Sequence, residues 1–291
     1  MKHSIWILFI GMLALGFLVS CGNNTDQKAP AKTVQQEKDS INIIAEKKDN
    51  SITPAPVSEK EKSLLADMNK YPDSLILTEN LIQYYRENGN YGNARKITDE
   101  SIAKNNRNPR LYYIKATLAY EDEDTLTAIK AFEKAVSILP DPDYYISLAT
   151  LYAQTKNPRS LSIADALISG SKAHKDKDAW FIKGLYYSNT GQKQKAISFF
   201  DKALNLSYTF MDAYREKALA LSAMGRNQDA IEVLNKGLTI MNSWDEGYYY
   251  SGMILEKMNN IQDAITSYKN ALVISPDYTE AKDALLRLGV Q

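Results

Sequence analysis

The sequence predicts an all-α protein in which helices pair into a repeated unit and the units stack as an α-solenoid. The first reason is a period of 34 residues that starts at Leu75 and runs to Tyr278. The second is that two positions of every period hold only Ala, Ser or Gly, which lets neighbouring helices approach closely. The third is composition, because the chain has too few Cys and His for a small fold held by disulfides or zinc.

Composition also excludes several classes of function. The 291 residues contain 35 Lys and Arg against 35 Asp and Glu, so no net charge attracts the chain to nucleic acid. A single Cys cannot form an intramolecular disulfide, and two His do not provide a set of zinc ligands. With 44% hydrophobic residues the chain can bury a core. We therefore expect a folded protein that does not bind nucleic acid.

Residues 1–20 have the pattern of a secretory signal peptide. Lys2 is basic, and an apolar run extends from Ile5 to Val19, which is too short for a comfortable membrane-spanning helix. The run ends in Leu-Val-Ser before Cys21, and these four residues resemble the bacterial lipobox. The resemblance implies cleavage after Ser20, attachment of diacylglycerol to Cys21 and acylation of the new amino terminus. The alternative is that Cys21 is an ordinary small hydrophobic residue.

The residue after the Cys bears on where such a lipoprotein would go. In the sorting rule of enteric bacteria, Asp at this position retains a lipoprotein in the inner membrane, and this chain has Gly22. Gly22 therefore resembles the signal for export to the outer membrane. No clear acidic run follows Cys21, so the periplasmic face is favoured and the cell surface stays open as an alternative.

Residues 21–58 are expected to be a lipidated Cys followed by a disordered tether. The segment is rich in polar residues, contains Pro30, Pro54 and Pro56, and shows no sustained apolar period. A neutral polar chain of about 37 residues has a typical end-to-end distance on the order of 30–35 Å. The folded region would thus be held near the membrane without lying on it.

Helices are expected at both flanks of the repeats. Residues 59–74 have helical apolar spacing that stops before Pro72, like a lone second helix of a preceding unit. Residues 279–291 continue the last unit as a C-terminal capping helix, with Leu285 and Leu286 expected to face inward. A solenoid needs such polar caps where it ends in water. The six units between them span residues 75–108, 109–142, 143–176, 177–210, 211–244 and 245–278.

Each unit reads as two antiparallel amphipathic helices. Twelve small residues occupy positions 20 and 27 of the six units, which has a chance probability on the order of 10⁻⁸ before allowing for the choice of phase. Small residues recur at position 8 and large ones at position 24, while Gly191 and Gly225 mark the turn between the helices. The residues at positions 20 and 27 are Ala94, Ala128, Ser162, Ala196, Ala230, Ala264, Ser101, Ala135, Ser169, Ala203, Gly237 and Ala271.

These positions resemble the tetratricopeptide repeat, whose pattern has an aromatic at position 4, Gly or Ala at 8, Tyr at 11, Ala at 20, an aromatic at 24, Ala at 27 and Pro at 32. The fourth unit reads Trp180, Gly184, Tyr187, Ala196, Phe200 and Ala203, and the sixth reads Tyr248, Gly252, Ala264, Tyr268, Ala271 and Pro276. The resemblance implies a right-handed α-solenoid. The first unit departs from it at Ile82 and Thr98, and the third fits better one residue out of phase.

In this family the first helices line a concave surface that binds a protein or peptide partner. Adjacent Tyr residues on one helix point about 100° apart, so one ring of a pair can face the core and the next the groove. Tyr rings are common binding anchors, and the alternative is that some of them pack between units. The resemblance implies partner contacts from Tyr113, Thr117, Tyr120, Phe181, Leu185, Arg215, Leu219, Tyr249, Met253 and Glu256.

No catalytic constellation is visible in the sequence. The only His of the mature chain is His174, in an expected inter-helix loop, and the acidic run Glu121–Asp124 lacks the Gly and later Glu of a calcium loop. We therefore expect no enzyme activity, cofactor or metal. The preferred hypothesis is a lipid-anchored scaffold or adaptor that binds proteins at the bacterial cell envelope, and the alternative is a lipoprotein that binds a glycan or small ligand in the same groove.

Overall fold

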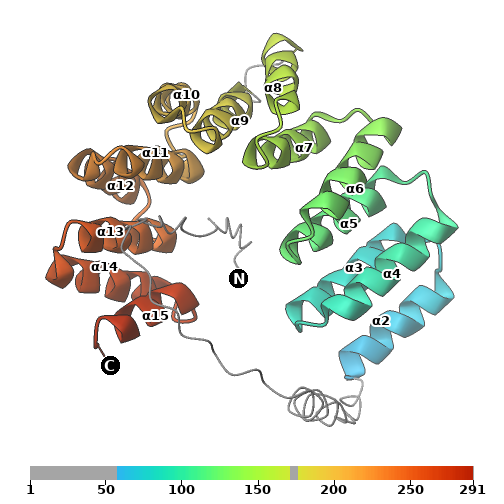
Figure 1. The fold of residues 1–291 in the computed structure, drawn as a ribbon. Coiled ribbons are helices and arrows are strands. Elements are labelled where there is room, and N and C mark those ends of the chain that lie inside the picture. The colour runs from blue at the N-terminus through green and yellow to red at the C-terminus, as the bar shows by residue number, and fades with distance from the viewer. Residues whose placement is uncertain (1–57, 171–175, 291) are drawn as a thin grey trace, which may run out of the picture. The chain divides into compact units, whose positions relative to one another are not determined.

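The computed structural model describes residues 58–170 and 176–290, and the chain divides into two units, residues 1–57 and 58–291. The expected signal peptide, Cys21, all but the last residue of the tether, and His174 lie outside the described residues. The described part of the chain is helical throughout and contains no strand (Figure 1). The helices are α2 (Glu59–Lys70), α3 (Leu75–Glu87), α4 (Tyr91–Lys104), α5 (Pro109–Glu121), α6 (Thr125–Ile138), α7 (Pro142–Gln154), α8 (Arg159–Gly170), α9 (Asp176–Asn189), α10 (Lys193–Leu206), α11 (Met211–Ala223), α12 (Asn227–Ile240), α13 (Asp245–Lys257), α14 (Ile261–Ile274) and α15 (Thr279–Arg287).

The helices form the pairs that the repeat requires, and the all-α solenoid is confirmed. The second helices of the six pairs begin at residues 91, 125, 159, 193, 227 and 261, each 34 residues after the last. The first helices begin where the units were expected to begin, except that α7 and α9 start one residue earlier. None of the described helices is long and apolar enough to cross a membrane.

Each helix packs against the helices that precede and follow it in the chain. The labels in Figure 1 follow this order from α2 to α15. The first helices of neighbouring pairs also contact one another, at α7–α9, α9–α11 and α11–α13, whereas the second helices of neighbouring pairs do not approach to the same extent within the described region. The first helices therefore lie on the side where neighbouring repeats are closest. We call the surface formed by α3, α5, α7, α9, α11 and α13 the inner face.

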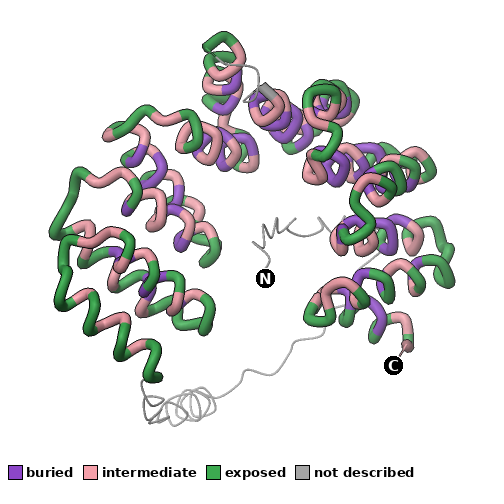
Figure 2. Tube along the Cα trace, turned by 180° about the vertical axis from the view of Figure 1, so that it is seen from behind, coloured by how far each residue is buried: buried purple, intermediate pink, exposed green. Residues whose placement is uncertain are grey.

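Small and large residues meet where the two helices of a pair cross. A Cβ added at Gly252 would lie 2.6 Å from Cε1 of Tyr268, and one at Gly184 would lie 2.5 Å from Cδ1 of Phe200, so both glycines are needed for this close approach. Buried stretches of the chain face neighbouring helices in Figure 2. In the first repeat the sizes are exchanged, because buried Ile82 takes the small position and buried Thr98 the large one.

The turn inside each pair uses the left-handed backbone conformation at position 15. Gly191 and Gly225 have φ of 84° and 79°. Glu123 and Asn259 adopt the same conformation without being Gly, each with φ 61°. In the third repeat the residue with positive φ is Lys156, one position earlier than the 34-residue count predicts. The first helix and turn of that repeat are therefore shifted by one residue, as the sequence pattern indicated.

The second helix of the third repeat, α8, packs differently from its counterparts. Ser162 and Ser169 were expected at close-packing positions, and both are exposed. Ser160 and Ala164 are fully buried instead. The helix is thus rotated about its axis relative to the other second helices, and the expectation for these two serines was wrong.

The core is divided among several clusters of buried residues, and α7 contributes to two of them. Leu148, Leu151 and Tyr152 join the cluster of α5 and α6. Ala149 and Ala153, on an adjacent side of α7, join the cluster that extends from α8 to α13. Helix α7 therefore separates the first two repeats from the last three.

The two end helices differ in how much they bury. No residue of α2 is fully buried. Helix α15 buries Ala281, Ala284 and Leu285 against the last repeat. Leu286, which was also expected to face inward, is 65% exposed, because adjacent residues on a helix point about 100° apart and only one of the pair can face α14.

Candidate partner-binding face

The predicted partner-binding residues all lie on first helices, but the structure divides them into three groups. Tyr113, Thr117 and Tyr120 lie on α5. Phe181, Leu185, Arg215 and Leu219 lie in the middle, on α9 and α11. Tyr249, Met253 and Glu256 lie on α13. The three groups differ in burial, and this decides which residues a partner can reach.

The two apolar residues of the middle group belong to the core. Phe181 is 8% exposed, and its ring centroid is 4.9 Å from that of Phe210 and 5.7 Å from that of Phe200. Leu185 is 2% exposed. Side chains at these positions fill the space between first helices where the repeats are closest, so the prediction that Phe181 and Leu185 contact a partner was wrong. Leu219 is partly buried.

Arg215 is buried and already paired. Its Nη1 lies 2.9 Å from carboxylate oxygens of Asp212 and Glu246, and its Nε lies 3.3 Å from Glu216. Burial raises the pKa of Glu216, and the neighbouring Arg215 charge opposes that rise. Arg215 therefore serves as the counter-ion of the buried Glu216 and of two partly exposed carboxylates, Asp212 and Glu246, rather than as a free binding group, which corrects its predicted role. No pattern in the sequence indicated that Glu216 is buried.

Ion pairs between neighbouring first helices recur along the inner face. Arg110 Nε donates to Glu79 Oε1 at 3.0 Å, and Arg215 Nη1 donates to Glu246 at 2.9 Å. In both pairs the two residues are 31 apart in the chain. The guanidinium of Arg287 bonds Glu256 at the same separation. This signal, opposite charges 31 residues apart, is present in the sequence and could have been found there.

At the α5 end the inner face holds a small cavity beside Tyr113. The Tyr113 ring centroid lies 5.3 Å from that of Tyr144 and 5.5 Å from that of Phe132, and the Arg110 guanidinium lies 5.4 Å from the ring. Thr117 donates its hydroxyl to the Tyr113 carbonyl at 3.0 Å. The cavity has a volume of about 100 Å³ and is lined by Arg86, Arg110, Tyr113, Ile114, Thr117 and Leu118.

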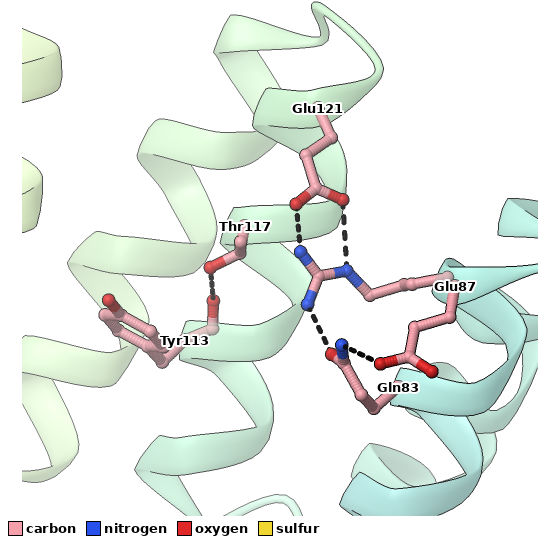
Figure 3. Close-up of polar contacts among 6 residues, drawn as sticks. Gln83, Glu87, Tyr113, Thr117 and Glu121 are labelled. Carbon is pink, nitrogen blue, oxygen red and sulfur yellow. Dashed lines mark hydrogen bonds and ion pairs between the residues drawn. The ribbon is translucent and has the colours of Figure 1, made fainter. Parts of the chain in front are cut away.

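The charge of Arg86 beside this cavity is neutralised. Its Nε donates to Glu121 at 3.1 Å, and its Nη1 donates to Gln83, which in turn donates to Glu87 (Figure 3). The remaining residue of the group, Tyr120, is half-buried. Burial raises the pKa of its phenol, while the charge of Arg215 opposes the rise. This end thus offers half-buried Tyr rings among paired charges.

At the α13 end the inner face holds a larger cavity of about 610 Å³. Tyr249 is half-buried, and Met253 is 40% exposed. Glu256 accepts hydrogen bonds from the Tyr268 hydroxyl at 3.0 Å and from Arg287 Nη2 at 3.0 Å, and the bond from Arg287 lowers its pKa. The lining residues are Tyr249, Met253, Glu256, Lys257, Tyr268, Glu280, Asp283, Ala284 and Arg287. Three of the predicted partner-binding residues therefore share one cavity.

Paired helices that repeat every 34 residues and present their first helices on one face define a helical-repeat protein of the solenoid class. Within that class the family models that match are tetratricopeptide repeats, at residues 80–142, 177–210 and 245–278. The chain is a tetratricopeptide-repeat protein. No curated protein sequence matches it.

Solved structures with this fold include other tetratricopeptide-repeat proteins. One, from Parabacteroides merdae, is 20% identical over 77% of this chain and 89% of its own, with a TM-score of 0.65. PilW, a widely conserved type IV pilus biogenesis factor, is 18% identical over 72% of this chain and 97% of its own, with a TM-score of 0.55. A thermophilic protein of Thermus thermophilus is 17% identical over 61% of this chain and 99% of its own, with a TM-score of 0.53. At these identities the likeness concerns the fold.

A metal site has no candidate in the described region. Residues 58–170 and 176–290 contain no group of three or more His, Cys, Asp or Glu placed to hold a metal ion. Tetratricopeptide repeats typically form scaffolds for protein interaction, and the repeats of this chain support that general role.

Proposed function

We propose that this protein is a non-enzymatic scaffold or adaptor lipoprotein of the bacterial cell envelope that binds an extended segment of a partner protein along its inner face. One observation carries the proposal. The cavity of about 610 Å³ keeps Tyr249, Met253 and Glu256 within reach of a ligand on the face that this repeat family uses for binding. Tyr113 and Thr117 line a second cavity on the same face. A segment in contact with both would lie across several first helices.

The membrane location in this proposal rests on the sequence around Cys21. The Leu-Val-Ser-Cys pattern after an apolar run supports lipid attachment, and Gly22 supports the outer membrane, with the periplasmic face favoured. Two or three acyl chains bury enough methylene groups, at about 0.8 kcal/mol each, for stable anchoring. The tether would then hold α2 and the repeats at a distance from the bilayer.

Fractionation tests the anchor. The variant Cys21→Ala should move from the membrane fraction to the soluble fraction, and the wild-type chain should yield an acylated amino-terminal peptide by mass spectrometry. Ser20→Ala is the matched control, because a small residue remains at that position and the Cys is untouched. A Cys21→Ala protein that stays with membranes as wild type does would refute the lipoprotein part and leave the binding part untouched.

Site-specific crosslinking in cells tests the inner face. A photo-crosslinking residue at Met253 or Thr117 should capture the same protein partner, because both positions line inner-face cavities. The control position is Val273 on α14, which is 80% exposed and does not line either of these cavities. Equal capture at all three positions would contradict binding on the inner face. A glycan found at Met253, with no protein, would support the alternative ligand class instead.

A further inference from the structure

The cavity at the α13 end contains more carboxylates than its own cations neutralise. Glu256, Glu280 and Asp283 all line it. Arg287 bonds Glu256 through Nη2 at 3.0 Å. Within the described part of the chain, Glu280 and Asp283 form no ion pair. Two carboxylates of α15 therefore face the cavity without a counter-ion from the surrounding residues.

The other cation of the cavity, Lys257, bonds another helix and forms no ion pair with these carboxylates within the described residues. Lys257 Nζ donates to the Ser222 carbonyl oxygen at 2.6 Å and contacts its hydroxyl at 3.2 Å. It thereby connects α13 to the end of α11 in the preceding repeat. The cavity lining has three carboxylates, Glu256, Glu280 and Asp283, against two cations, Lys257 and Arg287, and neither cation pairs with Glu280 or Asp283. The net negative charge would therefore repel an anionic ligand.

An aromatic ring and a flexible apolar side chain form the rest of the cavity wall. The Tyr249 ring is held by two others, with its centroid 5.0 Å from that of Tyr278 and 5.8 Å from that of Tyr268. Burial raises the pKa of Tyr249, and the charges of Glu280, Glu256 and Asp283 act in the same direction. Met253 is exposed beside it. The wall is thus apolar and electron-rich next to carboxylates.

We propose that this cavity binds a Lys or Arg side chain of the partner segment, with its charged end between Glu280 and Asp283 and its aliphatic stem along Tyr249 and Met253. This inference rests on the function proposed above and specifies the chemistry of the partner. A cation near an aromatic face and two carboxylates gains both cation–π attraction and charge-assisted hydrogen bonds. The long apolar stems of Lys and Arg suit a wall formed by Tyr and Met.

The occupant that fits is a basic segment of another protein, because the charge of the site is complementary to it. A neutral sugar would satisfy hydrogen bonds but would leave two carboxylates without a counter-ion. An acidic peptide would add to the like charge. A basic residue of the partner segment would bind at the α15 end of the inner face. Its position in the segment would therefore also determine the direction in which the segment lies along that face.

Selection from a phage library of random dodecapeptides tests the inference with the purified full-length chain. Peptides enriched on the wild type should be rich in Lys or Arg, and replacing the basic residue of a selected peptide by Ala should weaken binding about tenfold. Glu280→Gln combined with Asp283→Asn should weaken binding of the same peptides about tenfold. The control is Glu232→Gln combined with Asp73→Asn, which removes two exposed charges from outside the cavity and should leave affinity unchanged.

The possible outcomes separate this inference from the proposed function. Selected peptides without basic residues, or equal loss of affinity in both double variants, would overturn the inference and leave inner-face binding in place. Failure of the wild type to select any peptide would count against both. Tighter peptide binding after deletion of residues 22–57 would show that this segment of the chain competes for the site, and so would overturn the assignment to a partner. Unchanged melting temperatures would show that both double variants are folded.

Discussion

Trp244 lies between two glycines, and we expect Gly247→Ala to destabilise the protein for that reason. Trp244 is 5% exposed at the start of α13. A Cβ added at Gly247 would lie 2.6 Å from its Cδ2 and 2.8 Å from its Cζ3. A Cβ at Gly237, on α12, would lie 2.7 Å from the same Cζ3. The indole therefore cannot move away from residue 247 without approaching residue 237.

The net change in stability follows from two opposing effects. Overpacking of a core that cannot relax costs about 1–3 kcal/mol, and a ring held on both sides should fall in the upper part of this range. Replacing Gly by Ala within a helix returns at most about 1 kcal/mol. We therefore expect Gly247→Ala to lower the free energy of unfolding by about 1–2 kcal/mol.

A matched control is available in the first turn of another helix. Gly92 occupies the second position of α4, and a Cβ added there would meet only Asn90 Oδ1, at 3.9 Å. Gly92→Ala should therefore be neutral or stabilising, by up to about 1 kcal/mol. The same substitution should thus have opposite signs at the two sites.

Urea unfolding followed by circular dichroism measures both changes, and amide hydrogen exchange localises them, because repeat proteins need not unfold in a single step. The Trp244→Leu background provides a double-mutant cycle in which Gly247→Ala should lose most of its cost. Gly247→Ala with stability equal to or above wild type would refute the packing argument. An unchanged cost in the Trp244→Leu background would show that another contact is responsible.

Three further predictions concern buried charge and turns. Arg215→Met should cost about 3–5 kcal/mol in urea unfolding, because the buried Glu216 loses its cation. Arg226→Met, which breaks an exposed pair, should change stability by less than about 1 kcal/mol. Burial raises the pKa of Glu216, so the folded state favours its protonated form. The contribution of Glu216 to stability should be fully present below the ordinary value of 4.5 and should be lost as pH rises through the raised pKa. Glu216→Gln should flatten this part of the pH profile, and an unaltered profile would refute the assignment. In thermal unfolding, Glu123→Gly, at φ 61°, should raise stability by about 0.5 kcal/mol, because Gly adopts a positive φ without strain. Gly191→Ala, at φ 84°, should lower stability by about 1 kcal/mol. Stability changes of the same sign in the two variants would contradict the turn argument.

The sequence predicted the helices well because their determinants are local. The period fixes where each pair begins, Gly191 and Gly225 fix the turns, and the small residues opposite Phe200 and Tyr268 fix the crossing of the two helices. All of these depend on neighbours within one repeat. A repeat pattern therefore reports them directly.

The burial of inner-face residues could not be predicted in the same way. Phe181 and Leu185 occupy positions that the family exposes, but α9 lies close enough to its neighbours to bury them. The burial of Arg215 also depends on neighbouring helices, because the three carboxylates that surround it lie on α11 and α13. The distance between first helices varies from repeat to repeat and is set by packing of whole helices, so one residue's position in the period does not determine its exposure.

Helix α7 is the place where we expect the folded repeats to separate during unfolding. Leu148, Leu151 and Tyr152 belong to one core and Ala149 and Ala153 to the next, so α7 is the main link between the two. In the following helix, α8, only Ser160 and Ala164 are fully buried, and the partly buried Ile163 is its one side chain that packs against both cores. Unfolding of α7 would leave each core largely intact. We therefore expect a populated unfolding intermediate in which the repeats on one side of α7 stay native while those on the other side are denatured.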